Sequence, residues 1–521
     1  IEGACSIRHV RDMIDYAARR GFNAYFLQFR NAYTFFERWY GRENPNGRTD
    51  YTTADAARAW ERAKSEARRR GILLHTVGHG WTCEPFGISG LEWAPTKQRI
   101  PPPVVRHLAR IDGRRGLYQG TPLNTNLCYS SPRVRRIMAA AVADYAGEHP
   151  DEELVHVWLA DGTNNQCECA RCGGARPSDF YVQILNQIDV LLTARRLETR
   201  IVFLAYVDLL WAPQAEKIAN PDRFTLMFAP ITRSFTAPLL TEEARRRKPV
   251  ARLPPYRRNR LVFPRDTEEN LRFLDQWRRS FAGDCVDFDF HLMFDPTCDP
   301  SGMEIVPVLY RDLRDLGALE MDGYISAQRT RIAFPTGVAM HVMGHTLWNA
   351  KAGYRRLVGS YFRDLFGAAG DDAYCYLTRL GRLSMTAVLR GEQPFEVVQV
   401  RRKMAGIQGE VARFAPTIDA NLRRLEGLPS RRREQLGYRI SAWEILRHHA
   451  WYMTEFAALI VRVDPGNVAG TAAAVGDGFE QLESDSRRRC RALHHVFDGY
   501  YNMRMIAWML RRFGYDFPDA L

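Results

Sequence analysis

The stretch EELVHVWLADGTNNQCECARC, residues 152–172, decides the fold of this chain. Its segment 154–159 is a short β-like run, which ends on the carboxylate Asp161 and the turn residue Gly162. Barrels of alternating strands and helices place their catalytic acids at the C-terminal ends of such strands. We therefore expect a barrel with Asp161 at the end of the fourth strand, beside the functional site.

A dense cysteine cluster follows Asp161. Cys167, Cys169 and Cys172 have the spacing C-x-C-x-x-C, and a structural zinc site usually needs four ligands. Cys128 precedes the same strand and is the expected fourth ligand, with Cys83 as another candidate. Reduced thiols that pack the loop, or a disulfide, are the alternatives to zinc. We do not expect a nucleophile here, because neighbouring thiols would compete.

Strand-like and helix-like segments alternate over residues 1–334, which predicts a parallel sheet with helical crossovers. No glycine-rich phosphate loop follows any of the strands, and this argues against an open doubly wound sheet. We therefore expect an α/β fold, a (β/α)8 barrel of the TIM type, as the catalytic domain. Its eight strands are expected at residues 1–4, 23–29, 72–77, 154–159, 200–207, 224–228, 286–294 and 321–327.

The strand pattern stops near residue 335. From there to residue 521, apolar residues recur at helical spacing. We expect an all-α C-terminal domain, residues 335–521, that packs against the barrel and carries no chemistry.

Composition limits the class of protein. The 521 residues are 46% hydrophobic, which is enough for a large core and excludes a disordered chain. The net charge of +13 comes from arginine, and the arginine runs are typical of solvated helix faces rather than of a nucleic-acid interface. No apolar run is long enough for a membrane helix. We therefore expect neither nucleic acid nor a membrane as a partner.

Lone cysteines such as Cys285 and Cys375 are typical of a reducing compartment and favour a cytoplasmic protein. The chain starts at Ile1, which gives no information on targeting. The oligomeric state stays open, with a homodimer as one option.

Polar residues alternate along the predicted strand VDFDFHLMFD, residues 286–295. Because successive side chains of a strand point to opposite faces, one face is apolar and is expected to pack under the helices. The other face is expected to point into the barrel, where acids and an imidazole would be site chemistry. A polar plug is the alternative. This face carries Asp287, Asp289, His291, Met293 and Asp295.

The strand ILLHTVGHGW, residues 72–81, is expected to place His75, His79 and Trp81 on one face, with Glu84 in the following loop. Further polar residues lie at or beyond the ends of other predicted strands. They are Tyr206, Asp208, Arg233, Gln328 and Arg329.

Several stretches resemble one known family, the bacterial proteins of domain-of-unknown-function family 4838. This family is a glycoside-hydrolase-like barrel related to the family-20 hexosaminidases and to glycoside hydrolase family 163. The matching stretches are RHVRDMIDYAARRGFNAYFLQF (8–29), GHGWTCEPFGI (78–88), NLCYSSP (126–132), WLADGTNNQCECARC (158–172), DFHLMFDPTCDP (289–300), MDGYISAQRTRIAFPTG (321–337) and LWNAKAGYRRLVGSYFRDLFG (347–367).

The resemblance implies glycoside hydrolysis, and one branch of the family contains endo-acting N-acetylglucosaminidases that act on complex N-glycans. Family-20 enzymes carry an adjacent Asp-Glu pair at the end of the fourth strand. There the Glu protonates the leaving oxygen and the Asp orients the substrate acetamide. This sequence has Ala160-Asp161-Gly162 at that place, so the adjacent pair is absent.

Our hypothesis from the sequence is a glycosidase that acts on a glycan, such as one containing N-acetylhexosamine, and needs no cofactor for catalysis. Asp161 is the general acid or the acetamide orienter, Asp289 or Asp295 is the partner carboxylate, and Glu84 is a second candidate acid. The residues expected to line the sugar site are His79, Trp81, Tyr206, Arg233, His291, Gln328 and Arg329.

Two other functions stay open. One is a carbohydrate-binding barrel without turnover, which the missing glutamate favours. The other is a zinc-dependent hydrolase that uses His75, His79 and His291.

Overall fold

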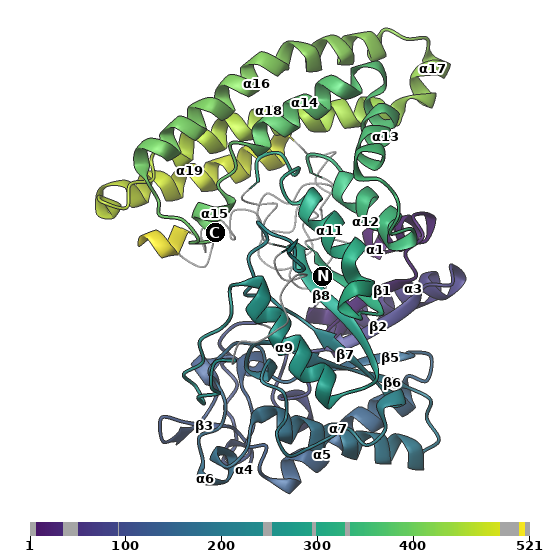
Figure 1. Cartoon of the computed structure of the whole chain (residues 1–521), viewed down its shortest axis with the longest axis vertical. Coiled ribbons are helices and arrows are strands. Elements are labelled where there is room, and N and C mark those ends of the chain that lie inside the picture. Colours follow the sequence, from purple (N-terminus) through teal and green to yellow (C-terminus); the bar gives the residue numbers. More distant parts are fainter. Residues whose placement is uncertain are drawn as a thin grey trace. The chain divides into compact units, whose positions relative to one another are not determined.

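The computed structural model describes residues 7–34, 51–91, 93–242, 253–293, 299–328, 334–489 and 510–515. The chain divides into two compact units. The barrel unit comprises Ile1–Asp289 and Asp315–Ser326, and the helical unit comprises Phe290–Arg314 and Ala327–Leu521 (Figure 1). The domain boundary predicted between residues 334 and 335 stays a prediction.

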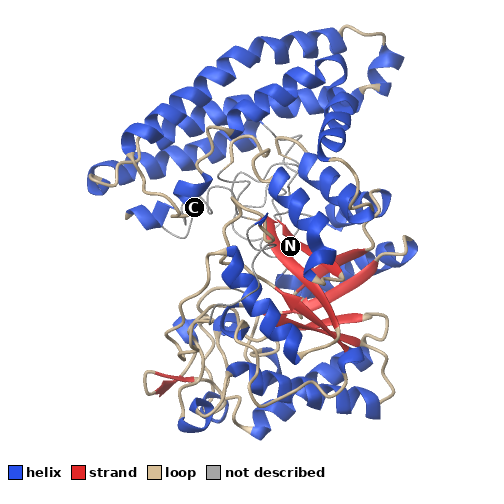
Figure 2. Cartoon of the chain, viewed as in Figure 1, coloured by secondary structure: helices blue, strands red, loops and turns tan. Residues whose placement is uncertain are grey.

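A seven-stranded sheet forms the centre of the barrel unit (Figure 2). Its order is β1-β2-β5-β6-β7-β8-β9, and the neighbours from β1 to β8 pair in parallel. The predicted first strand, residues 1–4, lies outside the described residues. The strands are β1 (Ala24–Gln28), β2 (Leu73–Gly78), β5 (Leu154–Val157), β6 (Arg200–Ala205), β7 (Phe224–Phe228), β8 (Asp284–Leu292) and β9 (Gly323–Gln328).

The sheet curls into a barrel, and ring contacts demonstrate this. Phe26 on β1 and Phe288 on β8 have ring centroids 6.4 Å apart, although five strand spacings separate the two strands in the sheet order. In a flat sheet that separation would be about 24 Å. The Trp158 ring lies 5.5 Å from Phe26 and 5.8 Å from Phe288. The predicted fold class, an α/β barrel with C-terminal helices, is confirmed.

One helix precedes β1, and others connect most of the successive strands of the barrel. Their starts follow from local chemistry: Thr52 and Asp55 form a reciprocal cap at α3, and Asp266 accepts two backbone N–H groups at α9. Proline stands in the first turn of α5 and α7, where its missing N–H costs nothing. The helices are α1 (Ile7–Arg19), α3 (Thr53–Arg69), α5 (Pro132–Glu148), α7 (Pro177–Ala194) and α9 (Thr267–Ser280).

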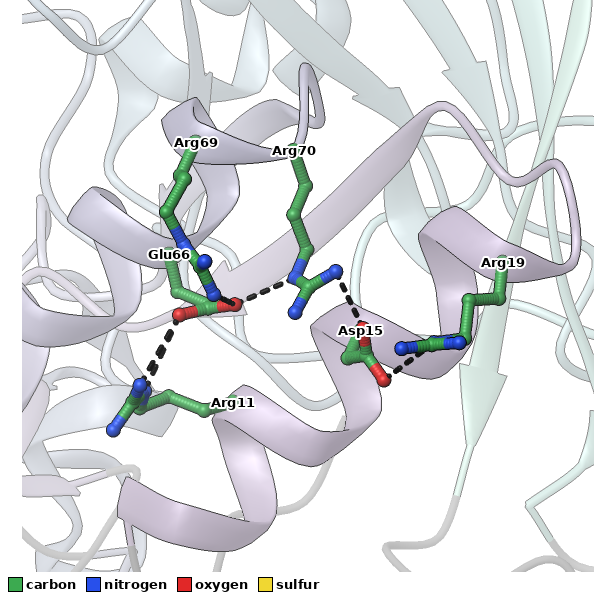
Figure 3. A network of polar contacts seen from close by, with 6 residues as sticks. All are labelled: Arg11, Asp15, Arg19, Glu66, Arg69 and Arg70. Carbon is green, nitrogen blue, oxygen red and sulfur yellow. Dashed lines mark hydrogen bonds and ion pairs between the residues drawn. The ribbon is translucent and has the colours of Figure 1, made fainter.

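An ion-pair network joins α1 to α3 (Figure 3). Glu66 of α3 accepts from Arg69 of its own helix at 2.7 Å and from Arg70, the residue that caps this helix, at 2.5 Å. It also accepts from Arg11 of α1 at 3.4 Å. Asp15 of α1 also pairs with Arg70. The hydrogen bond from Arg70, with help from Arg69, lowers the pKa of the Glu66 carboxyl to about 2. The network fixes α1 against the helix that precedes β2.

The helical unit is built on the antiparallel neighbours α16 (Val397–Glu426) and α18 (Gly437–Ile460). Aromatic rings fill its core. The ring centroids of Tyr376 and Phe414 are 4.2 Å apart in a stacked pair, and those of Phe366 and Trp443 are 5.0 Å apart. No helix in the described ranges combines the length and the apolar character that crossing a bilayer needs. The other helices are α11 (Val306–Asp315), α12 (Val338–Trp348), α13 (Tyr354–Phe366), α14 (Gly370–Gly381), α15 (Thr386–Leu389), α17 (Ser430–Gln435) and α19 (Val468–Arg489).

The ring contacts inside the barrel predict a large effect of truncating Phe26, which is 3% exposed. Phe26→Ala is expected to lower the free energy of unfolding by about 3–5 kcal/mol, because it removes the ring that contacts both Trp158 and Phe288 and leaves a cavity. Val190→Ala, at a site that is 66% exposed on α7, serves as the control and is expected to change it by less than about 0.5 kcal/mol. Urea unfolding measures both, and a cost of Phe26→Ala similar to that of the control would contradict this packing.

Candidate active site at the barrel mouth

Polar and aromatic side chains gather where the parallel strands end. In a parallel barrel all these ends lie on one side, which is the side where barrel enzymes carry their sites. We call this group the barrel mouth. It consists of Arg30 after β1, His79, Glu84 and Trp93 after β2, Trp158 and Asp161 after β5, and Tyr206 and Asp208 after β6.

Glu84 begins the short helix η1 (Glu84–Phe86) and is 16% exposed. Its Oε2 accepts a hydrogen bond from Arg30 Nη1 at 2.7 Å. Burial raises the pKa of the Glu84 carboxyl and outweighs the attraction of Arg30. Gly80 makes this approach possible, because its φ is +117° and a Cβ there would lie 2.9 Å from the Arg30 Cβ.

Asp161 is half-buried and is held from three sides. Its Oδ1 accepts from the Tyr206 hydroxyl at 3.3 Å, its backbone N–H donates to Leu123 O at 3.0 Å, and its carbonyl accepts from Asn165 Nδ2 at 2.8 Å. Burial, followed by the neighbouring Asp161, raises the pKa of the Tyr206 hydroxyl, so Tyr206 acts as a donor to the carboxylate.

Asp208 is a buried acid that our sequence hypothesis did not assign to the site. It lies in η4 (Val207–Leu209), and its Oδ2 accepts from the Asn164 N–H at 3.1 Å. Burial raises its pKa to about 6. Its Oδ1 has no hydrogen-bond partner among the described residues. The available signal was its place just beyond strand β6, which parallels the place of Asp161 beyond β5.

Aromatic rings form the wall of the mouth. The His79 ring packs edge-on between two indole rings, with its centroid 4.8 Å from that of Trp158 and 5.1 Å from that of Trp93. Trp93 Nε1 donates a hydrogen bond to Asn124 Oδ1 at 2.9 Å. Trp158 is 4% exposed, and its Nε1 has no partner within the described part of the chain. A buried polar atom without a partner is costly, so this N–H needs water or a ligand group.

The structure corrects the expected position of Trp81. The ring is fully buried, donates from Nε1 to the His156 carbonyl at 2.9 Å, and packs against Tyr145 of α5. The backbone explains the difference, because φ is positive at Val77 and at Gly78. These residues end the simple alternation, so Trp81 does not share a face with His79 and belongs to the core.

The structure also inverts the faces expected for β8. Phe288 points into the barrel, where it meets Phe26 and Trp158, so alternation turns Asp287 and Asp289 to the outer face. Asp289 there accepts from Arg233 Nη1 at 2.8 Å, and both side chains are fully buried. The expectation that these acids face the barrel interior was wrong. The Phe288 ring packs inside the barrel against Phe26 and Trp158, and alternation then places the acids on the outer face.

The remaining predicted site residues lie elsewhere. In the helical unit, His291 Nε2 lies 2.8 Å from Asp312 Oδ2 of α11, and Gln328 Nε2 lies 3.2 Å from Met340 Sδ. Asp295 and Arg329 lie outside the described residues.

The half-buried His75 pairs with the fully buried His156 within the barrel, with its Nδ1 2.9 Å from His156 Nε2. Burial lowers the pKa of His75 to about 4 and lowers that of His156 as well, so both rings are neutral at physiological pH. Neither His75 nor His79 belongs to a group of three potential metal ligands in the described ranges. This geometry gives no support to His75 or His79 as the zinc ligands of a hydrolase.

The structure brings the four expected cysteines together. The sulfur atoms lie within 4.8 Å of one another, and all four are free cysteines. Cys83 is not part of this group, because its Sγ lies 3.5 Å from the Gly80 carbonyl, and burial raises its pKa to about 12. The cluster, made of Cys128, Cys167, Cys169 and Cys172, is where a metal could be held.

A charged hollow of about 380 Å³ lies between α1 and α3 and includes the Glu66 network. It adjoins the last turn of α3, which precedes β2, and therefore the N-terminal end of that strand. Its guanidinium groups pair with carboxylates there, so we place the site at the mouth and not in this hollow.

Residues 107–251 match the model of a family described as a domain of unknown function, DUF4838. The chain carries a DUF4838 domain. This confirms the resemblance seen in the sequence over a span that includes Asp161, Asp208 and the four cysteines, whereas Glu84 precedes it. No curated protein matches the chain significantly.

The raised pKa of Asp208 predicts a pH-dependent effect of Asp208→Asn. The folded state holds the Asp208 proton more tightly than the unfolded state does, with a pKa of about 6 against 3.8. The wild type therefore loses stability as pH rises through this window, by up to roughly 3 kcal/mol. Asn cannot ionise and keeps an acceptor for Asn164.

We expect Asp208→Asn to gain stability relative to the wild type between about pH 4 and pH 8, as measured by urea unfolding. The exposed Asp222→Asn serves as the control and is expected to show no such gain. A difference between Asp208→Asn and the wild type that does not change with pH would contradict burial as the cause.

Proposed function

We propose that this DUF4838 protein is a glycoside hydrolase that acts on a glycan through carboxyl groups at the barrel mouth. The single observation that supports this most is the presence of three carboxyl groups at the ends of β2, β5 and β6. They are Glu84, Asp161 and Asp208, and they share this end of the barrel with an aromatic wall. Most glycosidases use two carboxyl groups, one of them protonated, and these three residues include such a pair.

In this proposal Glu84 is the general acid. A general acid must keep its proton near neutral pH, and burial of the Glu84 carboxyl favours the protonated form. Glu84 would donate its proton to the glycosidic oxygen as the bond from that oxygen to the anomeric carbon breaks. Water would supply the new hydroxyl group at the anomeric carbon, and its remaining proton would restore the carboxyl group.

Asp161 is the partner carboxylate. Positive charge develops on the sugar ring in the transition state, and a fixed carboxylate stabilises it. The Tyr206 hydroxyl and the backbone contacts hold Asp161 in one position, which avoids reorganisation during the reaction. If the substrate carries an acetamide, the same carboxylate would orient it.

The sugar would lie against the aromatic wall. Indole rings offer flat apolar faces, and Trp93 is the partly exposed ring of this wall. Arg233 would have a supporting role, because its guanidinium is buried against Asp289. We therefore do not place Arg233 among the residues that line the sugar site.

A non-catalytic carbohydrate-binding barrel is the second candidate. The observation that favours it is the sequence Ala160-Asp161-Gly162, which lacks the adjacent glutamate of family-20 enzymes.

Hydrolysis of a panel of aryl glycosides, including N-acetylhexosaminides, tests the proposal. We expect Glu84→Gln and Asp161→Asn each to lower kcat/KM by roughly 10²- to 10⁴-fold, because each removes acid–base or charge-stabilising chemistry. Glu153→Gln is the matched control, since Glu153 is exposed and precedes β5 at the opposite end of the barrel.

Binding of glycans without turnover by the wild type would identify the binding barrel instead. Turnover that survives both substitutions unchanged would remove Glu84 and Asp161 from the mechanism.

A further inference from the structure

Four cysteines from two separate segments meet beside the loop that carries Asp161. Cys128 comes from the segment before α5, and Cys167, Cys169 and Cys172 come from the segment after β5. Cys169 caps the short helix α6 (Ala170–Gly173), whose first turn carries Cys172. The Cys128 Sγ lies 3.6 Å from the Cys169 Sγ and 3.9 Å from the Cys172 Sγ, and all four sulfur atoms lie within 4.8 Å of one another.

These distances are those of a tetrahedral thiolate site. A zinc ion binds thiolate sulfur at about 2.3 Å, so two sulfur atoms of a tetrahedron around it are roughly 3.8 Å apart. A group of this size encloses one ion. Four sulfur ligands leave no open position for substrate or water, which is the arrangement of structural zinc sites and not of catalytic ones.

Groups around the cysteines suit the negative charge of such a site. The Arg110 backbone N–H donates to the Cys167 Sγ at 3.3 Å. The Arg115 guanidinium lies 3.6 Å from the Cys128 Sγ and 3.9 Å from the Cys167 Sγ. A zinc ion with four thiolates has a net charge of −2, and a neighbouring cation and N–H···S hydrogen bonds stabilise it.

We propose that Cys128, Cys167, Cys169 and Cys172 bind one zinc ion, which fastens the loop after β5 to the segment before α5. Asn165 makes the same connection by hydrogen bonds, from Nδ2 to the Asp161 and Asn124 carbonyls and through Oδ1 from Asn126 Nδ2. The zinc would therefore position Asp161 through the backbone. The metal site itself does not depend on the proposed glycosidase activity.

Metal analysis of the purified 521-residue chain tests the proposal. We expect about one zinc ion per chain, and we expect Co²⁺ in its place to give the visible absorption of a tetrahedral cobalt–thiolate site. Cys169→Ser is the informative variant, because Cys169 is only half-buried and its replacement disturbs packing least. It is expected to lose the zinc, whereas Cys375→Ser, at an exposed cysteine outside the cluster, is expected to keep it.

Arg115 offers a second test that leaves all four ligands in place. Arg115→Met is expected to weaken Zn²⁺ binding by roughly 10- to 100-fold in a competition titration with a chelator. Arg114→Met, at the neighbouring exposed arginine, is expected to leave the affinity unchanged.

Three results would overturn the assignment. They are a metal-free wild type that takes up no added Zn²⁺, iron bound in place of zinc, or equal zinc loss in Cys169→Ser and Cys375→Ser. Glycosidase assays are not needed for any of these, so a failure of the proposed activity would leave the metal site standing.

Discussion

Ring packing inside the barrel is the interaction on which the rest of the barrel unit depends. Phe26 stacks on His156 at 4.2 Å and meets Trp158 and Phe288 edge-on, so three distant strands share one set of contacts. Such pairs prefer definite geometries, and they fix which face of each strand turns inward. A one-residue shift of any of these strands would turn its ring out of the barrel.

The chemistry of the mouth follows from this choice of faces. Trp158 lies at the end of β5 and Tyr206 at the end of β6, so both strands deliver aromatic groups to the same end of the barrel. Asp161, three residues after Trp158, then reaches the Tyr206 hydroxyl. Because these groups are withdrawn from water, the pKa values of the Glu84 and Asp208 carboxyls rise, which favours the protonated form that a general acid needs. The clustered cysteines Cys167, Cys169 and Cys172 lie at the other end of the Asp161 loop.

Much of this arrangement could be predicted from sequence. The apolar run before Asp161 and the close spacing of the cysteines predicted the barrel strand and the grouping of Cys128 with Cys167, Cys169 and Cys172. The faces of β8 could not be predicted, because its alternating acids and rings fit either orientation until Phe26 is known to lie opposite Phe288. The place of Trp81 depends on positive φ angles at Val77 and Gly78, and a valine there gives no sign of one. The raised pKa of Asp208 depends on burial, which appears only when the loops are folded.

The central claim is that the mouth, with Glu84 and Asp161, is where a glycan is held and cleaved. A crystal structure with a bound oligosaccharide, obtained with the Glu84→Gln variant to slow turnover, tests it most directly. The account predicts a sugar ring against Trp158 and Trp93, with residues 84 and 161 on either side of the anomeric carbon. An oligosaccharide bound away from the strand ends, for example in the charged hollow between α1 and α3, would contradict it.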